Sequence, residues 1–333
     1  MPQPTLSDVH VNALLTNLSN MYMQEEEAFV ARRVFPDVPV QKASDRYMTY
    51  SRADFNRNTM RKRAPSTESA GGGYKIDNTP TYSVDVWALH KDIDDQIRAN
   101  ADAVLSLDME ATRWLVNQAL ISRENDWANS FFKTSVWTTE YTGVATGPSG
   151  LNILQWNDAS SNPIQNVRDA KRAVQLAGLY RPNKFVLGRP VFDALCDHPD
   201  FIDRIKYGQT PGRPAKVTLD AMAGLFEVDE VLVMDAIINN GVEGVTLNAN
   251  ESNAFIGNKA AMLVYTPSAP GIQTPGCGYS FSWTGYFGAS QNGTRMKSFY
   301  IPQINSTRVE IEAAYVHKLV SADLGAFFNT IIA

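Results

Sequence analysis

The longest helical pattern in the sequence runs from Asp102 to Phe132. Apolar residues recur there at steps of three, four or seven, which places them on one side of a helix with about 3.6 residues per turn. They are Leu105, Met109, Val116, Leu120, Trp127 and Phe131, with Leu107, Ala111, Trp114, Leu115 and Ile121 widening the face. No Gly or Pro interrupts the stretch, so the sequence predicts one long helix over residues 102–132. Its apolar face has to be covered by strands or by neighbouring chains.

Two stretches with alternating polarity predict extended strands near this helix. From Thr81 to Leu89, Tyr82, Val84 and Val86 alternate with polar residues. The second stretch has four apolar residues at every other position, which are Val309, Ile311, Ala313 and Tyr315. Because charged residues stand between them, we expect an amphipathic strand that lies along the long helix.

The segment 47–89 is predicted to be a long, two-armed loop. Its first arm, residues 47–63, is polar and basic with scattered aromatic residues, and Gly71, Gly72 and Gly73 follow one another before the second extended run at 81–89. Successive glycines favour a flexible tip. The segment has too few apolar residues to be stable alone, so we expect it to rest on another surface.

Residues 161–290 contain the pattern of a second, α/β domain. Asn162 and Pro163 are typical of a helix start, and Gly178 of a helix end. Short strands are predicted at 184–187, 230–234, 254–256 and 262–265. Residues 1–35 are predicted to form an arm with one short helix, whose apolar face is Val11, Leu14, Leu15 and Leu18.

Composition narrows the range of functions. The 333 residues are 44% hydrophobic, which is enough for two buried cores. A net charge of -5 argues against general affinity for nucleic-acid backbones or anionic membranes. Without a signal-peptide or membrane-span pattern we expect a soluble protein made in a cytoplasm. Cys196 and Cys277, the only cysteines, are expected to be free thiols.

The sequence offers little for catalysis. Phosphate-loop, dinucleotide-binding, zinc-protease and nucleophile-elbow motifs are all absent. The four histidines are far apart, so each is interpreted as structural; they are His10, His90, His198 and His317. The cluster Asp92, Asp94 and Asp95 lacks the glycine and later Glu of a calcium loop. We therefore expect no enzyme activity, cofactor or metal, with a soluble α/β enzyme as the less favoured alternative.

Several phrases together resemble a known family. NKFVLGRPVFDALCDHPDFIDRIKYGQT, AGLFEVDEVLVMDAI and GYSFSWTGYFGA are similar to segments of the axial domain in tailed-bacteriophage major capsid proteins. These proteins have the Hong Kong 97-type fold, which encapsulin shells share. The ending RVEIEAAYVHKLVSADLGAFF resembles the strand and tail with which such chains return to their peripheral domain. The resemblance covers roughly residues 45–330.

The resemblance implies an α+β fold and a domain division. The expected parts are an N-terminal arm at 1–45, an extended β-hairpin loop at 46–90, a peripheral domain at 91–160 and 291–333 with a long spine helix at 102–132, and an α/β axial domain at 161–290. The implied function is self-assembly of hexamers and pentamers into the icosahedral shell that encloses the double-stranded DNA of a bacteriophage. Shells would form in the bacterial cytoplasm and end in the virion, and an encapsulin-like compartment is the closest alternative.

The resemblance also implies which other molecules the chain contacts. Because no long helical extension precedes the arm, we expect the scaffold to be a separate protein. A portal is also expected, with a decoration protein as a further candidate. DNA would be enclosed without sequence-specific binding, and no membrane is involved. Some relatives crosslink a loop Lys to a neighbour's Asn. Lys62 and Lys75 are candidate donors, but no matching Asn or assisting carboxylate can be identified, so we do not expect a crosslink.

Charge predicts where two subunits meet. Between Ala43 and Arg63 there are six basic and two acidic residues, whereas between Asp92 and Asp126 there are eight acidic and three basic ones. In the family that the chain resembles, the loop lies across the neighbour's peripheral domain, so opposite charge would attract the two. The expected contact residues are Arg46, Arg52, Arg57, Arg61, Lys62 and Arg63 on the loop, and Asp102, Asp108 and Glu110 on the neighbour's spine helix.

Overall fold

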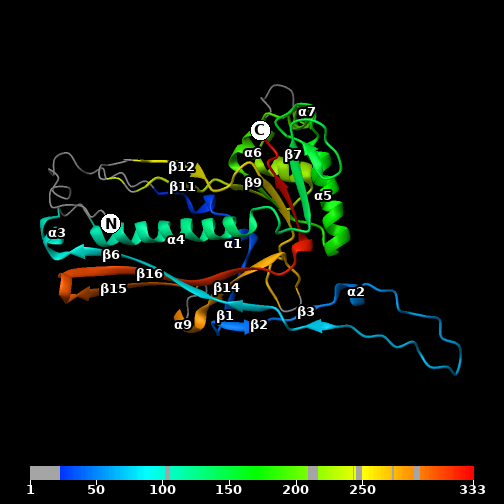
Figure 1. Ribbon diagram of the computed structural model, residues 1–333, viewed down its shortest axis with the longest axis horizontal. Helices are drawn as coiled ribbons and strands as arrows, with labels where there is room; N and C mark the ends of the chain where they lie inside the picture. Colours follow the sequence, from blue (N-terminus) through cyan, green and yellow to red (C-terminus); the bar gives the residue numbers. More distant parts are fainter. Residues whose placement is uncertain are drawn as a thin grey trace.

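The structure is a computed structural model, and it describes residues 23–101, 106–208, 217–242, 244, 250–271, 274–287 and 293–333. A long helix lies over a long, narrow sheet, an α/β body stands at one end of both, and an extended loop projects beyond that body's base (Figure 1). The molecule is therefore elongated, with the end of the long sheet and the tip of the loop on opposite sides.

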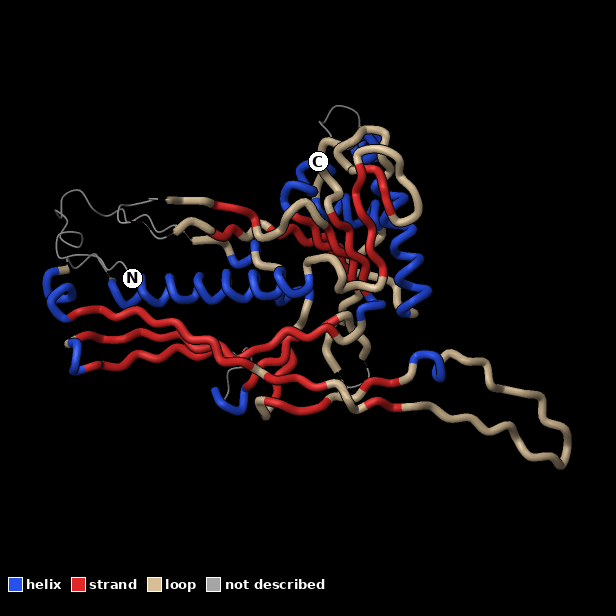
Figure 2. The backbone as a smooth tube through the Cα atoms, in the orientation of Figure 1, coloured by secondary structure: helices blue, strands red, loops and turns tan. Residues whose placement is uncertain are grey.

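The long helix, α4, spans Leu107–Phe131 and so lies inside the stretch predicted to be helical. At 1.5 Å per residue it is about 38 Å long. Asp102 and Leu105, which the prediction included, lie outside the described residues. Figure 2 shows the helix running alongside the strands of the long sheet for most of its length.

The long sheet is built around one central strand, β16, at Ser306–Leu319. Its antiparallel neighbours are β6 (Asp85–Asp94) on one side and β15 (Thr294–Ile301) and β14 (Gly278–Trp283) on the other. Strand β1 (Asp37–Val40) pairs with β14 in parallel. The amphipathic strand predicted around Val309 is thus present, and it packs against α4 as expected.

Helix α4 buries different sides at its two ends. In its first half Ala111 and Leu115 pack against Ile93, Val309 and Ile311 of the sheet. In its second half Trp127 and Ala128 are buried instead, on a side that the arm covers. The prediction of one continuous buried stripe was therefore wrong in the first half, where Met109 and Val116 are 53% and 38% exposed. The reason is that the sheet and the arm approach the helix from different directions.

The arm reaches the helix through two short elements, η1 (Glu26–Ala28) and α1 (Ala31–Val34). The ring of Phe35 lies 4.9 Å from that of Phe131 and 5.9 Å from that of Trp127. Close aromatic pairs of this kind add to the stabilisation that burial provides. The short helix predicted around Val11 to Leu18 lies outside the described residues.

The α/β body contains a six-stranded sheet in the order β10-β9-β13-β17-β7-β8. The strands are β7 (Thr139–Val144), β8 (Asn152–Leu154), β9 (Lys184–Gly188), β10 (Glu230–Met234), β13 (Ala261–Val264) and β17 (Gly325–Asn329). The helices are α5 (Pro163–Gly178), α6 (Arg189–Cys196), α7 (Pro199–Gly208) and α8 (Leu219–Phe226). Asn162 caps α5 by accepting a hydrogen bond from the Gln165 N–H, as its position predicted.

Sheet membership differs from the predicted domain limits. Strands β7, β8 and β17 lie outside 161–290 in sequence but complete the sheet of the body, whereas β14 lies inside that range and joins the long sheet. Strand β17 pairs in parallel with β7 and antiparallel with β13, and its Phe327 and Phe328 are fully buried. Long-range pairing of this kind leaves no local signal, because each strand also suits the other sheet.

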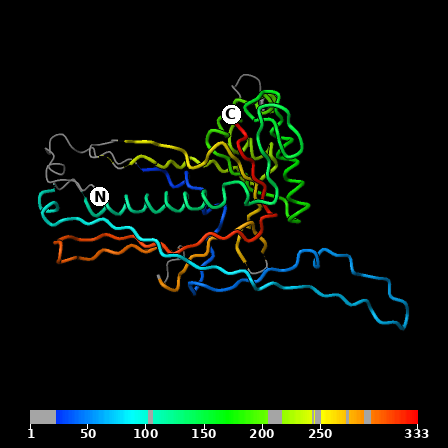
Figure 3. Tube along the Cα trace, viewed as in Figure 1, coloured from blue at the N-terminus to red at the C-terminus, as the bar shows by residue number. Residues whose placement is uncertain are grey.

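Smaller elements complete the chain. A hairpin of β11 (Ile237–Asn239) and β12 (Asn253–Phe255) leaves the body and contacts α4, as the yellow trace shows (Figure 3). The loop carries β2 (Ser44–Arg46), β3 (Thr49–Tyr50), α2 (Arg52–Phe55), β4 (Ile76–Asp77) and β5 (Thr81–Ser83). The remaining elements are α3 (Asp95–Asn100), α9 (Thr284–Phe287), η2 (Pro302–Ile304) and η3 (Ala322–Leu324).

The packing of α4 predicts unequal effects at two adjacent residues. Leu115 is fully buried against the sheet, whereas Val116 is partly exposed. We expect Leu115→Ala to lower the free energy of unfolding by about 2–5 kcal/mol, and Val116→Ala by about 0.5 kcal/mol or less. Urea denaturation of the unassembled chain would measure both. Equal losses would mean that α4 presents a different side to the sheet.

Candidate inter-subunit surfaces

The extended loop is the largest surface without its own core. Its two arms pair as strands over two short stretches, β2 with β5 and β3 with β4. Every residue from 55 to 79 is exposed. Figure 1 shows the loop extending away from both the sheet and the body. A two-stranded ribbon of this kind is marginally stable in water at best, so the loop requires a further surface to support it.

One part of the loop is nevertheless ordered by its own contacts. The Ser51 N–H donates to the Lys75 carbonyl oxygen at 3.0 Å, and the Lys75 N–H donates to the Asp54 carboxylate at 3.2 Å. These bonds bring three rings together, which we name the aromatic cluster: Tyr50, Phe55 and Tyr74. The ring centroids are 4.9 to 6.1 Å apart. The rings are 37–59% exposed, so the cluster is a preformed apolar surface.

The sequence analysis missed this cluster because Tyr74 lies on the opposite arm of the loop from the other two rings. The pairing of β3 with β4, which sets Tyr50 opposite Ile76, brings Tyr74 close to the other two rings. A usable signal was the presence of aromatic residues in a segment otherwise too polar to fold.

The six basic residues predicted on the loop have different surroundings. Arg52 forms an ion pair with Asp323 at 2.6 Å, and Arg57 lies 3.7 Å from Asp54. Arg63 donates from Nε to the Thr67 carbonyl oxygen at 2.5 Å. Arg46, Arg61 and Lys62 have no ion pair within the described part of the chain. The charge available to a partner is thus concentrated at 61–63, near the tip.

The acidic residues predicted on α4 are less available. Asp102 lies outside the described residues. Asp108 is bound by both terminal nitrogens of Arg98 at 2.7 and 2.8 Å, so much of its charge is compensated within the chain. Glu110 is half-buried and forms no ion pair in the described ranges. A single chain does not bring these residues near the basic loop, and their contact between two copies stays a prediction.

A second exposed apolar patch lies at the far end of the long sheet. Phe299, Tyr300 and Ile304 are 42–50% exposed, and the Tyr300 hydroxyl donates to the Asp95 carboxylate at 2.9 Å. With Asp94 beside them, these residues form an apolar, acidic surface that we name the sheet end (Asp94, Asp95, Phe299, Tyr300 and Ile304). The sequence analysis did not identify it.

The face of the long sheet that points away from α4 is charged but balanced. Arg295 and Lys297 both bind Glu312, at 2.7 and 2.5 Å. Arg308 binds Asp92 at 2.7 Å and lowers the pKa of that carboxyl. Cross-strand pairs of opposite charge support the register of the sheet. This face therefore offers little uncompensated charge to a partner.

A buried polar cluster lies where α4 meets the arm. Arg123 and Glu124 are 6% and 1% exposed. Both were included in the charge count of residues 92–126, but their burial makes them unavailable to a neighbouring subunit. Arg123 donates to the Asp37 carboxylate of the arm, and Glu124 Oε2 accepts a hydrogen bond from the Ala31 N–H at 2.8 Å. The sequence gives no local sign of this burial, because it depends on the arm that covers this side of α4.

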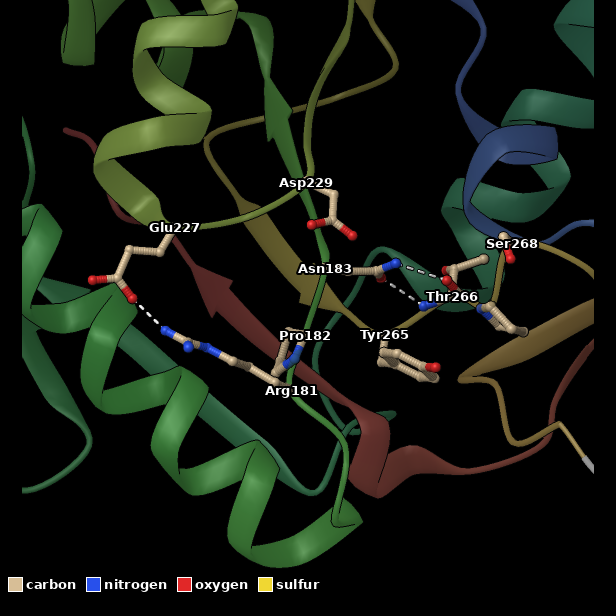
Figure 4. A pocket seen from close by; sticks show the side chains of 9 residues that line it. Arg181, Pro182, Asn183, Glu227, Asp229, Tyr265, Thr266 and Ser268 are labelled. Carbon is tan, nitrogen blue, oxygen red and sulfur yellow. Dashed lines mark hydrogen bonds and ion pairs between the residues drawn. The ribbon is translucent and has the colours of Figure 1, made fainter.

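One cavity of the body has hydrogen-bonded and ion-paired walls. The pocket in Figure 4, about 460 Å³ in volume, is lined by Arg181, Asn183, Glu227 and Thr266 among others. Arg181 pairs with Glu227, and Asn183 donates to the Thr266 carbonyl oxygen at 2.8 Å. These groups tie the body together, and they do not include a nucleophile beside a base.

The described histidines, candidate metal ligands and helices bear on whether the chain could be a catalytic, metal-binding or membrane protein. His198 lies 3.1 Å from the Ser161 hydroxyl, but both side chains are buried, so a substrate could not reach them. Within the described residues, no group of three or more His, Cys, Asp or Glu could hold a metal ion. In the same residues, no helix has the length and apolar character that crossing a bilayer requires.

Comparisons with known proteins agree with one another. Residues 154–281 match a family model described as phage major capsid protein E. The major capsid protein of Pseudomonas phage JBD67 is 25% identical over 311 residues, which cover 91% of this chain and 92% of that protein.

Two solved shells share the fold. The mature capsid of bacteriophage PhiM1 superposes with a TM-score of 0.58 at 14% identity, covering 97% of this chain and 92% of that one. The SrpI encapsulin of Synechococcus elongatus PCC 7942 gives a TM-score of 0.55 at 13% identity, covering 95% and 93%.

The aromatic cluster predicts a local effect within one chain. Because an aromatic pair contributes about 1 kcal/mol, Phe55→Ala should raise hydrogen exchange at the Ser51 and Lys75 amides about fivefold. Met60→Ala is the matched control, since Met60 is on the same loop and 91% exposed. Unchanged exchange in the Phe55 variant would show that the rings do not order the loop.

Proposed function

We propose that this chain, which belongs to the tailed-phage major capsid proteins with the Hong Kong 97-type fold, builds its closed icosahedral shell by laying its extended loop on the next copy. The observation that carries this proposal is the run of exposed residues 55–79. Such a segment keeps one conformation only when a partner supports it. The chain is a structural protein and not an enzyme.

The loop is suited to a partner with both apolar and acidic groups. Its base presents the aromatic cluster and its tip presents Arg61, Lys62 and Arg63. Interfaces of this kind are held by a few aromatic anchors, while charges mainly set orientation and partner choice. Asp108 is already paired with Arg98, which leaves it less able to bind the loop of another copy. The candidate contacts for the loop on a neighbouring copy are therefore Glu110, Asp102 and the sheet end.

The positions of these surfaces favour head-to-tail association. The loop tip and the sheet end lie on opposite sides of the elongated chain (Figure 1) and have opposite charge, so they can meet only between two copies. A heterologous contact repeated by rotation closes into a ring. Many modest contacts of this type, summed over a closed lattice, stabilise a shell without any strong single interface.

The parts of the chain are proposed to divide this work. The arm, the loop and the long helix with its sheet form the peripheral region. The six-stranded body, including β7, β8 and β17, acts as the axial domain around which hexamers and pentamers form. These limits extend the predicted axial range 161–290 by the strands that complete its sheet.

The interior content and further partners are also proposed. The shell encloses double-stranded DNA without sequence-specific contacts. A chain of net charge -5 binds DNA weakly, because it gains little from counterion release. A separate scaffolding protein and a portal are the expected assembly partners, with a decoration protein as a further candidate.

Charge reversal at the loop tip tests the proposed contact. We expect Arg61→Glu, Lys62→Glu and Arg63→Glu together to impair shell assembly most strongly at low salt, where screening is weakest. Particle yield by negative-stain microscopy is the readout. Circular dichroism of the unassembled chain should be unchanged, since the tip has no core. Wild-type yield at low salt would exclude charge pairing as the force that holds the loop.

The covalent state of the shell is a separate prediction. Neither Lys62 nor Lys75 has an identified Asn partner, so native particles should denature to a single band at 36.8 kDa. Denaturing electrophoresis of purified particles measures this directly. A ladder of larger bands would reveal a crosslink between subunits.

A further inference from the structure

Two adjacent residues of α4 hold the arm. Arg123 donates to Asp37, at the end of the segment Val30–Asp37, and Glu124 accepts from the Ala31 N–H near its start. Asp37 is also bound by Arg32 and by the Ser282 hydroxyl, so this end has several partners. At the other end, the buried Glu124 carboxyl group is the α4 side chain that accepts a hydrogen bond from the arm backbone, and it lies among the buried apolar residues Val30, Ala31 and Val34.

The surroundings of Glu124 are unfavourable for a charge. Its side chain is 1% exposed, and Oε1 has no hydrogen-bond partner in the described part of the chain. Arg123, its neighbour in sequence, is directed instead towards Asp37 and lies over the Tyr315 ring at 5.0 Å. An ionised carboxyl that is buried without an ion pair is costly.

Other titratable groups lie at the junction of α4 and the arm, and their protonation near pH 7 also has to be considered. Burial lowers the pKa of His317 to about 3 and raises that of Tyr315 to about 12, so both stay neutral near pH 7. Arg123 and Asp37 form an ion pair with each other. Asp126 on the same helix has a pKa raised by burial and by Asp85, so it requires a control.

We propose that Glu124 is a pH-sensitive latch that keeps the N-terminal arm on α4 while its carboxyl group is neutral and favours detachment when it ionises. Detachment would expose the carboxylate to water and remove the cost of its burial. The latch concerns the arm within one chain, so it does not rest on the proposed contact between copies.

The direction of the pH effect follows from the pKa shift. Burial raises the pKa of Glu124 from 4.5 to about 7, although the Ala31 and Val30 N–H groups act in the opposite sense. A raised pKa means that the attached state binds the proton more tightly. The stabilisation of the attached arm is therefore complete below pH 4.5 and is lost as the pH rises through about 7.

Hydrogen exchange on the unassembled full-length chain tests the latch. The Val34 and Phe35 amides donate to the Val30 and Ala31 carbonyl oxygens, so they report on the attached arm. After correction for the intrinsic exchange rate, their protection should fall about tenfold between about pH 6 and about pH 8. In Glu124→Gln, which stays neutral and keeps a carbonyl acceptor, protection should not change with pH.

Two matched variants test whether other carboxyl groups of α4 cause the pH dependence. Asp126→Asn and Glu110→Gln remove carboxylates from the same helix and should retain the wild-type pH dependence. A flat wild-type profile would overturn the proposal. So would a pH dependence that persists in Glu124→Gln or disappears in Asp126→Asn.

A second measurement does not depend on how any variant folds. Infrared titration of the wild-type chain should show a protonated, buried carboxyl group that ionises near pH 7. If all carboxyl groups are already ionised at about pH 6, the latch does not exist.

Discussion

The structure depends on covering both buried sides of α4. Its first half needs the strands β6 and β16, and its second half needs the arm around Phe35. These partners come from residues 29–35, 85–94 and 306–319, so three segments far apart in the sequence meet on one helix. A single isolated helix of this length would expose most of its apolar residues. Burial of α4 therefore determines how the peripheral region is assembled, and the loop and the body extend from that base.

Charge is distributed in a way that suits assembly. Along the outer face of the long sheet, Arg295, Lys297 and Arg308 are matched by carboxylates of neighbouring strands. At the loop tip, by contrast, Arg61 and Lys62 have no ion pair in the described ranges. Matched charges fix register within a chain, whereas unmatched charges can steer a second chain. The matched pairs thus stabilise the sheet of one chain, and the unmatched residues are those proposed to contact a second copy.

The fold alone does not identify the content of the shell. A bacteriophage capsid and an encapsulin both superpose on this chain, with TM-scores of 0.58 and 0.55. The sequence is more specific, because its match to a phage major capsid protein covers 91% of the chain. The fold therefore fits both kinds of shell, and the sequence comparison favours the phage capsid.

The sequence determined the local structures and the tertiary structure decided their partners. A long helix, the amphipathic strand at Val309 and the cap at Asn162 follow from periodicity and backbone chemistry within a few neighbouring residues, so they were predictable. That β17 joins the body, that Val116 is exposed while Glu124 is buried, and that Tyr74 meets Phe55 depend on segments far apart in sequence. No local pattern encodes which of two suitable surfaces a segment will meet, because that choice rests on packing across the whole chain.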